Sequence, residues 1–69
     1  MRRQPIDSSA ISSAGYDAGS RTLEVEFRSG AVYDYFGVPP RVWKSLLTAD
    51  SKGRYVSRQI RDRFPFARR

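Results

Sequence analysis

The residues best suited to chemistry are the Lys and Arg side chains that gather near the end of the chain. Residues 52–69 carry seven Lys or Arg and one acid, whereas residues 1–51 carry six of each, so the formal charge of +6 resides in the last segment. On a helix, Arg54, Arg58 and Arg61 follow the i, i+4, i+7 spacing and share one face. Guanidinium groups bind phosphate oxygens through paired donors. The pattern favours contact with a polyanion, and a solvated face that keeps a small protein soluble is the alternative interpretation.

The composition excludes several kinds of catalytic and metal site. The chain has no Cys and no His, which removes thiol and imidazole ligands, bases and nucleophiles. The seven acids are scattered along the sequence, and no pair is spaced as an acid–base couple. Ser51 next to Lys52 is interpreted as a helix cap, because neighbouring residues on a helix do not face each other. We therefore expect no enzyme, no metal and no cofactor.

The length and hydropathy of the chain predict one small domain with a marginal core. No apolar stretch approaches the roughly 20 residues of a membrane span, and no apolar run follows Met1–Arg3 as it would in a secretory signal. The absence of cysteine fits a reducing compartment. We expect a cytoplasmic protein with no membrane contact.

The strongest strand signal is the alternation of apolar and charged residues from 22 to 28, which is followed by an aromatic return strand from 31 to 36. A three-residue loop at 28–30, with Gly30 in a left-handed conformation, fits this hairpin better than a two-residue loop. Its register predicts the pairs Val25 with Tyr33, Leu23 with Tyr35, and Glu24 with Asp34. The two tyrosines then join the core face, and the two acids lie on the face toward water.

The flanking segments complete a small α+β fold of the order β-β-β-α-α. Residues 8–16 are interpreted as a weak edge strand, and Gly37–Pro40 end the sheet. A helix from about Pro40 to Ala49, with Trp43 on its apolar side, is expected to cover one face of the sheet. Asp50 or Ser51 begins a second helix that carries the arginines and ends before Pro65. We expect a flexible arm at 1–7, the domain at 8–67 with a short final strand near Phe66, and a basic tail at 68–69.

Several short motifs, in their order and spacing, resemble the KTSC domain family. They are Ser8-Ser-Ala-Ile11, Gly15-Tyr-Asp17, Leu23-Glu-Val-Glu-Phe27 with Ser29-Gly30, Tyr33-Asp-Tyr35, Gly37-Val-Pro39, and Ser51-Lys-Gly-Arg-Tyr55. This family is named for its occurrence at the C-terminus of some lysyl-tRNA synthetases and also includes small free-standing bacterial proteins. RNA binding has been suggested for the family, and the resemblance implies no catalytic residue and no cofactor.

Our first functional hypothesis is a nucleic-acid-binding module that contacts backbone phosphates, with RNA and DNA both open. Tyr55 is the favoured candidate for stacking on a base. For Tyr33 and Tyr35 a place in the core is the preferred interpretation, and base stacking is the second one. The alternative is a protein-interaction or structural module whose basic helix meets an acidic partner. Val32 and Phe36 on the outer sheet face also leave a homodimer open. The expected phosphate contacts are Lys52, Arg54, Arg58, Arg61 and Arg63, with Arg41 and Lys44 as secondary contacts.

Overall fold

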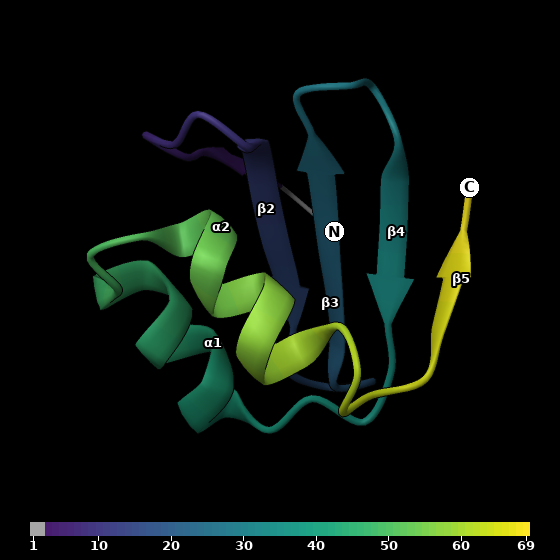
Figure 1. Ribbon diagram of the computed structural model, residues 1–69. Coiled ribbons are helices and arrows are strands. Elements are labelled where there is room, and N and C mark those ends of the chain that lie inside the picture. Colours follow the sequence, from purple (N-terminus) through teal and green to yellow (C-terminus); the bar gives the residue numbers. More distant parts are fainter. Residues whose placement is uncertain (1–2) are drawn as a thin grey trace.

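The computed structural model describes residues 3–69 and consists of one antiparallel sheet with helices on one of its faces (Figure 1). The strands lie side by side in chain order, β1-β2-β3-β4-β5. This arrangement confirms the predicted α+β class, including the final strand that pairs with β4. The elements are β1 (Gln4–Pro5), β2 (Ile11–Asp17), β3 (Thr22–Phe27), β4 (Val32–Tyr35), α1 (Pro40–Thr48), α2 (Lys52–Tyr55), the π-helical turn η1 (Val56–Ile60) and β5 (Phe66–Arg68).

The hairpin between β3 and β4 has the predicted register. Val25 lies opposite Tyr33 and Leu23 opposite Tyr35, with Glu24 facing Asp34 on the other side of the sheet. Gly30 adopts a φ of 95°, in the region that residues with a Cβ rarely enter. The three-residue loop therefore sets the pairing, and the pairing brings both tyrosines to the side of the sheet that the helices cover.

The core lies between the sheet and the helices and includes the predicted apolar faces of both. Tyr35 is 2% exposed, whereas Tyr33 and Trp43 are half-buried and pack against the core. Trp43 stacks on Tyr16 of β2, with ring centroids 5.9 Å apart. The buried residues are Ile6, Ile11, Ala14, Leu23, Val25, Tyr35, Val38, Leu46, Val56 and Ile60.

The N-terminal segment differs from the loose arm that we expected for residues 1–7. Gln4 and Pro5 form a short strand along β2, and Ile6 is only 5% exposed. The chain therefore supplies an edge strand before residue 8, and β2 lies inside the sheet rather than at its edge. Burial of Ile6 offsets the ordering of this segment. Residues 1 and 2 of the expected arm lie outside the described part of the chain.

The second helix begins as predicted at Ser51, whose side chain accepts a hydrogen bond from the backbone N–H of Arg54 at 3.3 Å. Gly53 lies where α2 approaches the start of β2, and a Cβ at this position would come within 2.9 Å of the Ala10 Cβ. Glycine is a poor helix former, and here it permits the close contact of helix and sheet. After α2 the backbone widens into η1, where the N–H of Arg61 donates to the Val56 carbonyl at 2.8 Å.

The uncovered face of the sheet carries an ion-pair cluster that joins both ends of the described chain. Glu24 is 4% exposed instead of open to water as expected. Arg69 donates to its carboxylate at 2.8 Å and to Asp34 at 3.1 Å, and Arg3 lies 3.3 Å from Glu24. The expected basic tail at 68–69 is therefore part of the sheet: Arg68 belongs to β5, and Arg69 neutralises the two facing acids. No helix in residues 3–69 has the length and apolar character needed to cross a membrane.

Candidate functional site

The positive charge of the protein is concentrated on the side of the sheet that carries the helices. Residues 40–64, which contain both helices, hold seven Lys or Arg and two Asp. Three of the remaining acids lie on the uncovered sheet face in ion pairs: Glu24, Glu26 and Asp34 pair with Arg3 or Arg69. The two faces therefore differ in charge, and the helix side attracts anions more strongly.

The π-helical turn divides the arginines that an ideal helix would place in one row. A π turn closes its hydrogen bond one residue later than an α turn, so the residues that follow it are rotated relative to those before it. Arg54 and Arg58 remain together beside Tyr55 in an open hollow of about 260 Å³. Arg61 instead lines a second cavity, between η1 and the sheet. The expected single stripe of Arg54, Arg58 and Arg61 is thus split between two sites.

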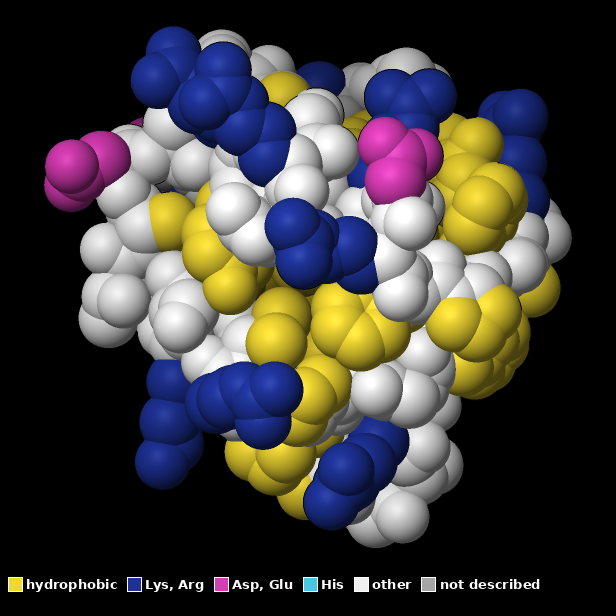
Figure 2. Space-filling model, turned by 60° about the horizontal axis from the view of Figure 1, so that its bottom comes forward, with side chains coloured by type: hydrophobic (Ala, Val, Ile, Leu, Met, Phe, Trp, Pro, Cys, Tyr) yellow, Lys and Arg dark blue, Asp and Glu magenta, His cyan; other side chains and the backbone are white. Residues whose placement is uncertain are grey.

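The other cations predicted as phosphate contacts have different environments. The Lys52 ammonium donates to the Ala49 carbonyl at 2.9 Å, so it satisfies an acceptor at the end of α1. Arg63 follows η1 and is exposed, as are Arg41 and Lys44 on α1. On the face shown in Figure 2, Lys and Arg side chains form several separate groups around apolar surface instead of one continuous stripe. A polyanion bound along this side would therefore contact Lys and Arg side chains that are separated by apolar surface.

The aromatic residues named from the sequence also fall into two groups. Tyr55 is half-buried against the core and borders the hollow that contains Arg54 and Arg58. Tyr33 and Tyr35 lie on the other side of the helix, in the wall of the cavity that contains Arg61. The core assignment of Tyr35 is confirmed by its burial. The structure therefore separates the tyrosines between the same two sites as the arginines.

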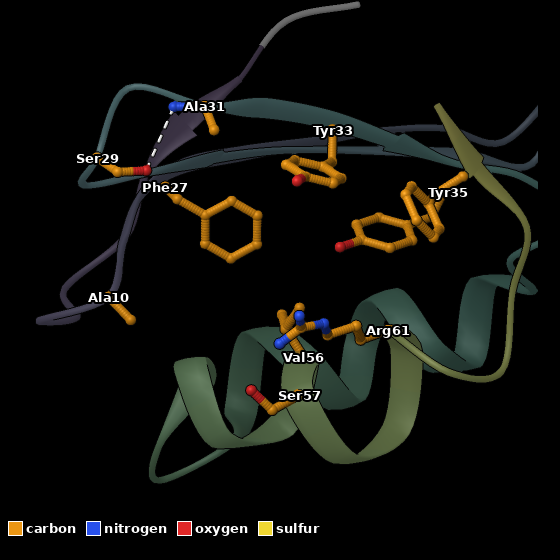
Figure 3. Close-up of a pocket in the computed structure, with 10 residues that line it drawn as sticks. Ala10, Phe27, Ser29, Ala31, Tyr33, Tyr35, Val56, Ser57 and Arg61 are labelled. Atoms are coloured by element: carbon orange, nitrogen blue, oxygen red, sulfur yellow. Dashed lines mark hydrogen bonds between the residues drawn. The ribbon is translucent and has the colours of Figure 1, made fainter. Parts of the chain in front are cut away.

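The cavity between η1 and the sheet has a volume of about 420 Å³ (Figure 3). Rings from β3, β4 and β5 form its sheet side, and the helix contributes the side chains that face them. The pKa of the Tyr35 phenol is raised, first by burial and then by the neighbouring Tyr33, while Arg61 acts in the opposite direction. The lining residues are Ala10, Phe27, Ser29, Ala31, Tyr33, Tyr35, Val56, Ser57, Arg61 and Phe66.

Comparison with known proteins identifies the family. A model of the KTSC domain matches residues 7–64. The chain belongs to the KTSC domain family. The KTSC domain described here has the same fold as a crystal structure of a KTSC domain protein from Yersinia pestis, with a TM-score of 0.95 and 41% identity over 99% of this chain and 96% of that one.

Relatives of the KTSC domain occur both as small proteins and within larger ones. A protein of Tsukamurella paurometabola is 48% identical over 88% of this chain and 91% of its own length. A lysine–tRNA ligase of Nostoc punctiforme is 42% identical over 87% of this chain, but the matched region is only 11% of that enzyme. The similarity to the ligase therefore concerns a small part of it.

The pairing of two β5 side chains with the tyrosines of β4 in this KTSC domain was not predicted from the sequence. Phe66 lies opposite Tyr35 in the pairing of β4 with β5, and Arg68 lies opposite Tyr33 with its guanidinium carbon 5.9 Å from the ring centroid. The alternation of Phe66 and Arg68 beside the Tyr33–Tyr35 alternation is the signal that could have revealed this shared face. Within residues 3–69, no group of acidic side chains is arranged to hold a metal ion.

Proposed function

We propose that this protein is a nucleic-acid-binding module that contacts the backbone of single-stranded RNA with its helix side and performs no catalysis. The observation that carries the proposal is the charge difference between the two faces, with seven Lys or Arg against two Asp in residues 40–64. The Lys and Arg side chains of the helix side are separated from one another, and a nucleic-acid backbone offers phosphates at regular intervals. Each phosphate contact releases counterions and does not depend on the base sequence.

The choice of RNA over DNA rests on the relatives. Lysine–tRNA ligases carry a region similar to this chain, and their name states that they act on a transfer RNA. Single-stranded segments are favoured over duplexes because the hollow at Arg54 and the cavity at Arg61 are each lined by tyrosine as well as arginine. This combination can stack on unpaired bases. We also propose that the protein acts in the cytoplasm.

The test is the affinity of the protein for fluorescent single-stranded RNA, duplex RNA and duplex DNA at several salt concentrations. We expect micromolar or tighter binding near 0.15 M salt, tightest for single-stranded RNA. A log–log slope of about −3 to −4 would correspond to roughly four to six neutralised phosphates. Replacing Arg54 and Arg58 by Gln should reduce the slope by about 1.4, since each lost contact on a single strand is worth about 0.7.

The matched control is Arg21→Gln, which removes an exposed cation of the β2–β3 turn that borders neither cavity. Its affinity and salt slope should equal those of the unchanged protein. If the control reduces the salt slope by as much per removed charge as the replacement of Arg54 and Arg58 does, the binding is general attraction to a basic protein and the proposed site is wrong. If binding disappears near 0.15 M salt, the proposal fails, and an acidic protein partner becomes the hypothesis to pursue.

A further inference from the structure

The cavity between η1 and the sheet has the lining of a small-ligand site. Its volume of about 420 Å³ lies within the range of ligand pockets. Tyr33 is the central ring of its aromatic wall, with Phe27 edge-on at 5.6 Å and Phe66 tilted at 5.5 Å between ring centroids. Tyr35, which is 2% exposed, lies next to Tyr33 and closes the floor. A flat apolar ligand could lie against the Tyr33 ring with its edges among the others.

The polar groups of the cavity restrict the charge of that ligand. Arg61 is the charged residue among the lining side chains, and Figure 3 shows it facing the tyrosine rings from the helix. Arg68 of the edge strand β5 is outside this lining, but its guanidinium lies over the Tyr33 ring, with the guanidinium carbon 5.9 Å from the ring centroid. No acid lines the cavity, so a cationic ligand would have no partner. Ser29 and Ser57 provide hydroxyls that can hydrogen-bond to polar ring atoms.

The backbone of η1 is the reason that Arg61 lies at this cavity. In a continuous α-helix Arg61 would share the face of Arg54 and Arg58, whereas the bond from its N–H to the Val56 carbonyl at 2.8 Å turns it toward the sheet. Turns of this kind are rare and occur often at functional sites. The irregular backbone and the aromatic lining thus meet in one place.

We propose that this cavity binds one unpaired nucleotide, with its base against Tyr33 and its phosphate between Arg61 and Arg68. The nucleotide has two sources of the same chemistry, a free nucleoside monophosphate or an unpaired residue of an RNA strand. The second source rests on the proposed function, and it would add base contact to the phosphate contacts of Arg54 and Arg58. Aromatic and arginine surfaces accept every base by stacking, so little preference among bases is expected.

The experiment uses the full chain and follows the ring signals of its tyrosines by NMR. Three probes are titrated: adenosine 5′-monophosphate, a six-residue adenylate RNA, and an oligonucleotide of the same length that has no bases. We expect the RNA to shift the Tyr33 ring signals, and the abasic strand to bind without shifting them. Saturable binding of the monophosphate at the same ring signals would identify a free nucleotide as a sufficient ligand. Binding of the RNA alone would identify a residue within a strand.

Tyr33→Leu keeps apolar bulk and removes the ring, and it should weaken RNA binding by about 5- to 150-fold with an unchanged salt slope. Tyr33→Phe retains the ring and is the matched control, which should bind within about threefold of the unchanged protein. Arg61 is exposed, so Arg61→Gln should fold normally and weaken binding of the base-containing RNA by about tenfold or more.

Two results would overturn the nucleotide site. They are equal affinity for the abasic and base-containing strands, and unchanged RNA affinity in a folded Tyr33→Leu or Arg61→Gln variant. Either result would leave the proposed phosphate contacts of Arg54 and Arg58 intact, because those are judged by the salt slope. Conversely, monophosphate binding at Tyr33 without salt-dependent RNA binding would support the cavity and reject the proposed function.

Discussion

Truncation of Tyr35 tests the packing on which both the core and the cavity depend. The side chain is 2% exposed, and its ring lies 6.2 Å from Tyr33 and 6.0 Å from Phe66. Removing a buried aromatic side chain costs about 3–5 kcal/mol of unfolding free energy. Because Tyr35 already borders a cavity of about 420 Å³, water can fill the space that the ring leaves. We therefore expect Tyr35→Ala to cost about 3 kcal/mol, the lower end of that range.

The size of the protein makes this loss easy to observe. A chain of 69 residues has a total stability of about 3–10 kcal/mol. A loss of about 3 kcal/mol corresponds to a fall in melting temperature of roughly 12–24 °C for a domain of this length. Urea unfolding followed by the fluorescence of Trp43 measures the change directly, since this single tryptophan stacks on Tyr16.

The matched control is Tyr35→Phe, which keeps the ring and removes the hydroxyl. We expect it to change the free energy of unfolding by less than about 1 kcal/mol. A loss below about half a kcal/mol for Tyr35→Ala would refute the assignment of this ring to the core. The residue would then be available as a ligand contact in its own right.

Three further predictions concern the stability at alkaline pH, the contact between Gly53 and Ala10, and the ion-pair cluster. The raised pKa of Tyr35 means that the folded state favours the neutral phenol. The contribution of this group to stability should therefore be complete below about pH 10 and should fall as the pH rises above it. Urea unfolding midpoints measured from about pH 8 to pH 11 should show this fall, and Tyr35→Phe should show less of it. Gly53→Ala should lower the free energy of unfolding by about 1–2 kcal/mol because its Cβ would come within 2.9 Å of the Ala10 Cβ. Adding Ala10→Gly should restore much of this stability. Equal costs with and without the second change would contradict the contact. Arg69→Ala should cost about 1 kcal/mol, a value limited by its exposure. In a double-mutant cycle the cost should become smaller in a Glu24→Gln background, while the part that comes from the Asp34 pair remains.

The parts of the fold that local chemistry determines were predictable from the sequence. Gly30 after Ser29 indicates a three-residue hairpin loop, and the alternation of Leu23, Val25 and Phe27 indicates which side of the sheet is buried. Together they fix the positions of the two tyrosines of β4, which the structure confirms. Ser51 was likewise predictable as a helix cap because its type and position meet the needs of a helix start.

The parts that depend on contacts between distant residues were not predictable. Arg3 and Arg69 are far apart in sequence and meet through Glu24, and nothing in the segment of either arginine indicates the shared carboxylate. The π-helical turn was missed for a different reason: projecting residues 52–62 at 3.6 residues per turn assumes a regular helix. That assumption placed Arg61 beside Arg58 and concealed its position at the aromatic cavity.

The meeting of Arg3 and Arg69 on Glu24 also determines how such a domain can be joined to other chains. Arg3 next to β1 and Arg69 after β5 reach Glu24 from the two opposite edges of the sheet, on the face away from the helices. Sequence attached at either end of the chain would therefore leave from the sheet and not from the helices. A host attached here would leave α1, α2 and η1 facing outward. The ion-pair cluster therefore ties both edges of the sheet to its centre.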